Sequence, residues 1–194
     1  MKATRCASIA PLAGLLIFAV ALAVRLVHVW QIRKAPFFDV LMGDSHGYDE
    51  WAQRIAGGEW IGRDVFYQAP LYPYFLGVVY AVAGRSLLVV RIVQAIVGAS
   101  SCVLLGAAAR RLFSPAIGLA AGLMLALYAP AIFFDGLLQK SVLDVFFVCL
   151  AMCVIARIVT YRSPSGAEDQ RSQTGRRARE AVVDQHGRGA RGSR

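Results

Sequence analysis

Hydrophobic residues in this chain form long runs that are separated by shorter polar stretches. Four of these runs approach the length of about 20 residues that an α-helix needs to cross a bilayer. We therefore predict an all-α, polytopic membrane helix bundle with spans at about Ile9–Trp30, Leu87–Ala109, Ala116–Phe134 and Leu143–Tyr161. The first run follows a charged start, like a signal peptide, but exceeds the usual apolar core of about 7 to 15 residues. We interpret it as a span and keep a cleaved signal as the alternative.

A polar loop with two shorter helical segments separates the first span from the second. In its first half, Asp44 or Ser45 is expected to cap a helix of about a dozen residues, which Gly57 and Gly58 end. The second segment, Ala69–Gly84, would be only about 24 Å long as a helix, short of a hydrocarbon core of about 30 Å. Because its tyrosines and prolines suit the membrane interface, we predict two juxtamembrane helices in this loop.

The distribution of basic residues decides between four and five crossings. With four crossings and a cytoplasmic amino terminus, the Arg110–Arg111 turn and the basic tail both lie in the cytoplasm, as the positive-inside rule prefers. Five crossings would place both outside. We favour four crossings, although Arg33, Lys34 and Arg85 then lie on the outer side.

The composition is typical of a membrane protein and argues against a nucleic-acid partner. Hydrophobic residues make up 57% of the chain and charged residues only 17%. The net charge of +9 is concentrated in the tail, and no base-stacking or phosphate-cradling motif accompanies it. We divide the chain into a transmembrane part, 1–161, and a tail, 162–194, whose Arg, Gly, Ser and Gln content predicts a disordered cytoplasmic segment.

Small residues within the spans predict packing rather than chemistry. Gly118 and Gly122 have the spacing of close helix contacts. The cysteines have no His or third Cys at ligand spacing, so we expect all four to fill the core or to face lipid: Cys6, Cys102, Cys149 and Cys153.

Two carboxylates fall on the outer side in the four-span topology. Asp44 opens the helix of the first outer loop, and Asp144 lies in "KSVLDVFF", where the last span begins. Lys140 precedes Asp144 by one helical turn. A carboxylate beside lipid is costly and usually serves a function. We therefore expect two carboxylates and a lysine to converge at the outer surface.

Each of these polar residues also has a simpler interpretation. Asp44 could do no more than cap its helix, while Asp49 and Glu50 could complement the helix dipole in the first turns. Arg91 and Lys140 could extend toward the lipid headgroups.

Several segments, taken in order, resemble a known family. They are "GDSHGYDEWAQRIAGGEW", "QAPLYPYFLG", "AGRSLLVVR", "RRLFSPAIGLAAGLM" and "KSVLDVFF". Together they look like the amino-terminal core of the GT-C membrane glycosyltransferases, nearest to the branch of protein-mannosyltransferases and aminoarabinose transferases. The residues that match the order of the family's motifs are Asp44, Tyr48, Gly58, Trp60, Pro70, Pro73, Gly84, Arg91 and Asp144.

The resemblance implies that a sugar moves from a polyprenyl-phosphate carrier to an acceptor hydroxyl or amine, with inversion at the anomeric carbon. It implies that Asp44 acts as general base and that Lys140 and Arg91 are the cations beside the leaving phosphate. Asp144 would orient these cations or help to hold a divalent metal ion, and Tyr48 would contact the substrate. The expected partners are membrane lipid and the lipid-linked sugar donor, while the metal requirement and the oligomeric state stay open.

The chain departs from the family's pattern in two places. Ser45 replaces an acidic residue, and Gln68-Ala69 replaces a Glu-Lys pair, so no lysine is available there to bind the donor. Because the family has more than four spans, we expect either a truncated glycosyltransferase of the bacterial plasma membrane or a non-catalytic partner subunit that keeps the amino-terminal fold. A small transporter, the third alternative, would place its polar residues at the bilayer midplane.

Overall fold

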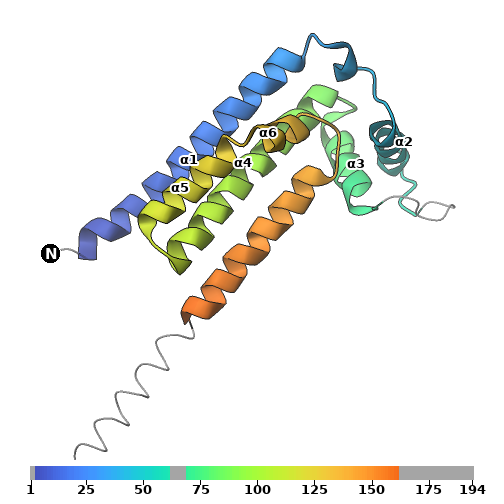
Figure 1. Cartoon of the computed structure of the whole chain (residues 1–194). Coiled ribbons are helices and arrows are strands. Elements are labelled where there is room, and N and C mark those ends of the chain that lie inside the picture. Colours follow the sequence, from blue (N-terminus) through green and yellow to red (C-terminus); the bar gives the residue numbers. More distant parts are fainter. Residues whose placement is uncertain (1–2, 62–68, 162–194) are drawn as a thin grey trace, which may run out of the picture.

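A computed structural model describes the backbone of residues 3–61 and 69–161 and, within them, all side chains except those of residues 3–10 and Phe37. The described residues form helices joined by short connections, with no β-strand among them (Figure 1). The predicted all-α membrane bundle is therefore confirmed, whereas the predicted tail, 162–194, lies outside the described residues. In chain order the elements are α1 (Ala3–Ile32), the 3-10 turn η1 (Pro36–Phe38), α2 (Asp44–Ala56), α3 (Leu71–Ala83), α4 (Leu87–Leu112), α5 (Pro115–Ala126), α6 (Ala129–Asp135) and a last helix over Ser141–Tyr161.

Three helices in the described part of the chain are long and apolar enough to cross a membrane. They are the segment Pro11–Ile32 of α1, then α4, and the last helix, Ser141–Tyr161. The pair α5 and α6 makes a fourth candidate, but it bends by 54° between its two helices. The predicted span over Ala116–Phe134 corresponds to this bent pair, so the described residues have three spans, or four if the pair counts as one.

The bend between α5 and α6 has a local cause. Pro130 lies in the first turn of α6 and has no N–H to offer to the carbonyl of Ala126, four residues earlier. Arg25 of α1 donates to that carbonyl instead, at 3.4 Å from Nη1. A side chain from another helix thus satisfies the backbone group that the break would otherwise leave without a partner.

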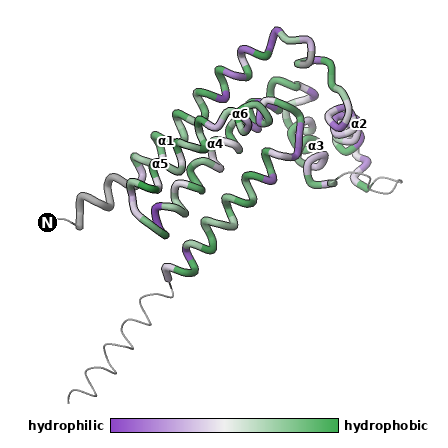
Figure 2. The backbone as a smooth tube through the Cα atoms, in the orientation of Figure 1, coloured by the Kyte–Doolittle hydropathy of each residue, from purple (hydrophilic) through white to green (hydrophobic). Residues whose placement is uncertain are grey.

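Helix α4 packs against both α1 and α5, and Figure 2 shows that all three are hydrophobic over most of their length. Glycines allow this contact. A Cβ atom on Gly118 would lie 2.7 Å from the carbonyl oxygen of Gly106, and one on Gly122 would lie 2.6 Å from Cδ1 of Ile17. The predicted packing role of Gly118 and Gly122 is confirmed. The three cysteines whose side chains are described are free and buried: Cys102, Cys149 and Cys153.

Helices α2 and α3 lie together beside one end of the bundle (Figure 1). With 13 residues, α3 is about 20 Å long and cannot cross a hydrocarbon core of about 30 Å. One face of α3 is buried against α2 and the bundle, while Leu71, Val78 and Val82 leave an exposed apolar face. This arrangement agrees with two juxtamembrane helices and with the four-span topology.

Candidate functional site

Helix α2 carries the first predicted site residue in its first turn. The residue that caps the helix is Gly43, with φ 59°, and no side chain makes a capping hydrogen bond. The prediction that Asp44 or Ser45 caps this helix was therefore wrong. Ser45 instead donates from Oγ to the carbonyl oxygen of Leu138 at 2.9 Å. This bond holds the start of α2, with the exposed side chain of Asp44, against the segment that leads into the last helix.

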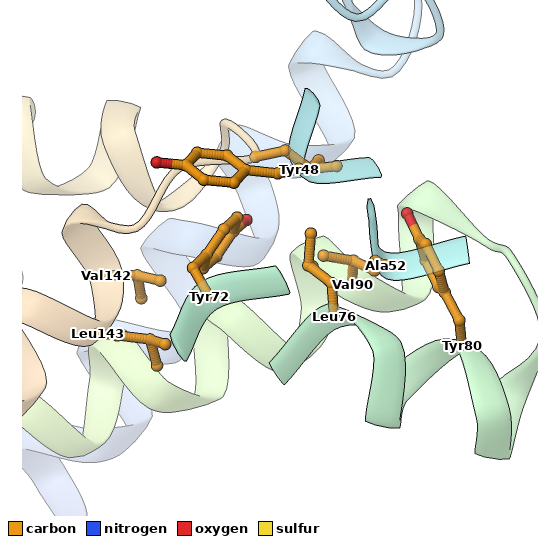
Figure 3. Packing of buried hydrophobic residues seen from close by; sticks show 9 residues of the cluster. Tyr48, Ala52, Tyr72, Leu76, Tyr80, Val90, Val142 and Leu143 are labelled. Carbon is orange, nitrogen blue, oxygen red and sulfur yellow. The ribbon is translucent and has the colours of Figure 1, made fainter. Parts of the chain in front are cut away.

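Tyr48 lies one turn further along α2 and is 4% exposed. Its ring lies edge-on to the ring of Tyr72 (Figure 3), and the two ring centroids are 5.0 Å apart. Burial raises the pKa of the Tyr48 hydroxyl, and the negative charges of Asp44 and Asp144 raise this pKa further. Both predicted carboxylates therefore lie close enough to one tyrosine to influence it, although they are 100 residues apart in the sequence.

Lys140 and Asp144 are both exposed at the beginning of the last helix. The backbone carbonyl of Lys140 accepts from the amide groups of Leu143 at 2.9 Å and of Asp144 at 3.1 Å. This hydrogen bonding fixes the first turn of the helix, next to the segment that Ser45 binds. The structure thus brings Asp44, Tyr48 and the Lys140–Asp144 turn to one place, which we call the outer site.

Arg91, in contrast, is buried below this surface, with 1% of its area exposed. Its Nε donates to the carbonyl oxygen of Gly136 and its Nη2 to that of Phe38, each at 2.9 Å. The guanidinium carbon also lies 3.8 Å from the centroid of the Phe38 ring. Arg91 therefore joins η1 to the segment before the last helix. Its role at a phosphate stays a prediction, and these contacts favour a positioning role.

A second buried network supports the outer site and was not foreseen from the sequence. The Tyr72 hydroxyl donates to Oε1 of Gln94 at 2.9 Å. The amide nitrogen of Gln94 donates in turn to the carbonyl oxygens of Asp135 at 3.1 Å and Leu137 at 2.7 Å. These bonds tie α3, α4 and the end of α6 together. The available signal was a single glutamine inside the apolar run of α4.

Asp49 anchors α2 to α3 and to the turn after it. The carboxylate is 2% exposed and accepts from the Tyr80 hydroxyl at 2.5 Å, from Nη2 of Arg85 at 2.7 Å and from the amide of Gln53 at 2.9 Å. Burial alone would raise the pKa of Asp49, but the hydrogen bonds and the charge of Arg85 outweigh it and hold this pKa below its usual value. The interpretation of Asp49 as a helix-dipole acid was thus incomplete, because Asp49 is also the partner of Arg85 in an ion pair.

Other residues of the resemblance shape the backbone around the outer site. Gly58 and Gly84 have φ of 101° and 75°, a region that favours glycine. Trp60 stacks on Tyr74, with 6.3 Å between the ring centroids, and Pro70 precedes the first residue of α3. These positions fix turns and helix ends.

The described residues were compared with what a metal site requires. Within 3–61 and 69–161, no group of three or more His, Cys, Asp and Glu side chains is placed to hold a metal ion. Asp44 and Asp144 supply two carboxylates at the outer site, so a divalent ion held there stays a prediction.

Comparison with known proteins identifies the family to which the chain belongs. Residues 67–166 match the family described as dolichyl-phosphate-mannose-protein mannosyltransferase. The matched segment covers just over half of the 194 residues. The matched segment contains Arg91, Lys140 and Asp144, whereas Asp44 and Tyr48 precede it. No curated protein and no solved structure matches the chain.

Proposed function

Because the chain belongs to the dolichyl-phosphate-mannose-protein mannosyltransferase family, we propose that it transfers a sugar from a polyprenyl-phosphate carrier to an acceptor on the outer face of the membrane. At family level it is a glycosyltransferase-type membrane protein, and the GT-C resemblance of its sequence is confirmed to that extent. The proposal covers both an active enzyme and the amino-terminal part of a longer one.

The observation that carries the proposal is that Asp44 and Asp144, far apart in the sequence, both act on the hydroxyl of Tyr48. Transfer needs a base for the acceptor proton, and an exposed aspartate within reach of the acceptor can take it. We assign this role to Asp44. As the acceptor oxygen or nitrogen bonds to the anomeric carbon, the bond from that carbon to the carrier phosphate breaks, and the phosphate leaves with the electron pair. The exposed ammonium group of Lys140 would offset the charge of this phosphate.

The remaining residues of the outer site assist these two. Tyr48 has a raised pKa, so its hydroxyl keeps its proton and can donate a hydrogen bond to the donor or the acceptor. Asp144 follows Lys140 by one turn and would orient its ammonium group or share a divalent ion with Asp44. Arg91 acts indirectly in this scheme, because its guanidinium binds carbonyl oxygens of the protein.

The proposal can be tested by sugar transfer in membranes that contain the full chain. A radiolabelled polyprenyl-phosphate mannose serves as donor, and label is followed into acceptors. Asp44→Asn should lower the rate by about 10²- to 10⁴-fold, the usual contribution of a general base. Glu50→Gln is the matched control, since Glu50 is an exposed acid of the same helix that pairs only with His46, at 3.2 Å, among the described residues. Full activity of the Asp44→Asn variant would refute the catalytic assignment.

If the chain transfers no sugar, binding of the lipid carrier can still be measured. A photoreactive polyprenyl phosphate should crosslink to the wild-type protein, and Lys140→Gln should weaken the labelling. Equal labelling of both forms, combined with no transfer, would favour the non-catalytic partner subunit.

We also propose that the outer site faces the extracytoplasmic side of a bacterial plasma membrane and that the carboxyl-terminal tail lies in the cytoplasm. The charge of the Arg110–Arg111 turn supports this orientation. Met42 and Phe113 lie on opposite sides of the spans in the four-span topology, and both are well exposed, at 77% and 70%. A membrane-impermeant thiol reagent should label a Met42→Cys variant in intact cells. It should label a Phe113→Cys variant only after permeabilisation, and the reverse pattern would contradict the orientation.

A further inference from the structure

An apolar groove of about 760 Å³ runs between α1, α4, α5 and the last helix. Apolar side chains from all four helices line it, including Leu15, Phe18, Val103, Leu119, Phe146 and Leu150. Three glycines also belong to its wall: Gly14, Gly106 and Gly118. Such a groove is unsuited to water, which needs two or more polar partners to remain in a cavity.

One charged residue, Arg110, also lines the groove. Arg110 is half-buried and makes no ion pair or side-chain hydrogen bond with another residue in the described part of the chain. Its neighbour Arg111 points elsewhere, since its Nη1 contacts Sγ of Cys153 at 4.0 Å. The groove therefore combines an apolar wall with one cation that no described side chain neutralises.

This groove is separate from the outer site. Arg110 follows Arg91 by 19 residues on the same helix, which corresponds to about 28 Å along the helix axis. Arg91 lies beneath the outer site, whereas Arg110 lies in the last turn of α4 at the opposite end of the bundle. A ligand phosphate bound at Arg110 would thus be remote from Asp44 and Asp144.

We propose that the groove binds an anionic phospholipid, with an acyl chain along the apolar wall and the phosphate beside Arg110. The spans place the groove in the bilayer, where acyl chains are the available apolar material. A basic residue between helices near the membrane surface attracts anionic headgroups, and no described protein group competes for Arg110. The inference is independent of the proposed function, because it rests on the groove and on Arg110 alone.

The headgroup part of the proposal is tested by native mass spectrometry of the delipidated full chain after addition of phosphatidylglycerol or phosphatidylcholine. The wild-type protein should retain phosphatidylglycerol preferentially. Arg110→Gln should weaken phosphatidylglycerol binding by about fivefold, the effect of one basic residue near anionic lipid, and should leave phosphatidylcholine binding unchanged. Arg111→Gln is the matched control, because it removes the same charge one position later and should keep the preference.

The acyl-chain part is tested by filling the groove. A Cβ atom on Gly14 would meet only Cγ1 of Val103, at 3.8 Å, an ordinary contact. Gly14→Leu therefore places its Cβ without a clash, and its side chain should reduce the retention of both lipids although Arg110 is intact. Equal loss in the Arg110→Gln and Arg111→Gln variants would overturn the proposal. So would undiminished lipid binding by Gly14→Leu, or a second copy of the chain bound in place of lipid.

Discussion

Arg25 of α1 donates from Nε to Oδ2 of Asp135 at 2.7 Å, and both side chains are buried. Arg25 lies within a candidate span, and Asp135 ends the bent pair of helices. Charged residues inside spans are costly and usually pair with one another. The same guanidinium also bonds the carbonyl oxygen of Ala126, so Arg25 holds residues on both sides of the bend.

Removal of one partner of this pair should destabilise the bundle strongly. Asp135→Asn leaves the guanidinium of Arg25 without its counter-ion, and loss of one partner of a buried pair costs about 3–5 kcal/mol. Replacing both partners together, as Arg25→Met with Asp135→Leu, should recover much of this loss because no charge stays buried. Unfolding titrations in mixed micelles measure the free energies. An Asp135→Asn variant as stable as the wild type would contradict the role of the pair.

Gly98 should not tolerate even a methyl group. A Cβ atom at this position would lie 2.2 Å from Oδ2 of Asp135 and 2.7 Å from Nε of Arg25, so the ion pair would have to move. We expect Gly98→Ala to lower the free energy of unfolding by about 1–3 kcal/mol, the usual cost of overpacking. Gly14→Ala is the control, since its helix gains a better helix former without a clash. Equal free energies of unfolding for the two variants would contradict the close packing of Gly98 against the ion pair.

The attachment of α2 to α3 should weaken in acid. The pKa of Asp49 is lower in the folded protein than its ordinary value, so ionised Asp49 contributes stability above about pH 4, and this contribution is lost as the pH falls through the lower folded-state pKa. Hydrogen exchange of the α2 amides should therefore accelerate in this acid range, after correction for the intrinsic exchange rate.

Comparison with variants isolates the contribution of Asp49. Asp49→Asn should accelerate hydrogen exchange of the α2 amides already at neutral pH, and the exchange rate of this variant should no longer depend on pH in the acid range. Glu50→Gln should retain it. If Asp49→Asn kept the same acid dependence as the wild type, another group would be responsible.

Convergence of the two site carboxylates can be measured without any enzymatic activity. Asp44 and Asp144 both raise the pKa of Tyr48. Asp44→Asn and Asp144→Asn should therefore each lower this pKa toward the ordinary value of tyrosine, whereas Glu50→Gln should leave it unchanged. NMR of ring-labelled tyrosine, with Tyr48→Phe to assign the signal, follows the titration. An unchanged Tyr48 pKa in the Asp144→Asn variant would show that the Asp144 carboxylate does not act on Tyr48.

Local patterns in the sequence were sufficient to predict most helices. The predicted helix of about a dozen residues before Gly57 corresponds to α2, with 13 residues, because glycine at a helix end acts through its own backbone. The bend before Pro130 has an equally local cause. It was missed because the hydropathy of the run continues through it.

Contacts between distant residues account for what the sequence did not reveal. Arg25 and Asp135 are 110 residues apart, and no periodicity links them. Arg91 was assigned to a phosphate or to the headgroups, since a sequence does not show which carbonyl oxygens surround a guanidinium. Asp44 and Asp144 were expected to share one side of the membrane, and the charge effect of both on Tyr48 supports this part of the site.

The spacing of the buried ion pair also constrains how the protein is assembled. Arg25 is synthesised 110 residues before Asp135, and synthesis proceeds from the amino terminus. The first span therefore enters the bilayer with an arginine whose partner does not yet exist, and such a residue costs at most about 2.5–3.5 kcal/mol, the value at the centre of a helix. A nascent chain that stops before Asp135 therefore lacks the counter-ion of Arg25. The first span reaches its final charge balance only after α6 has been synthesised.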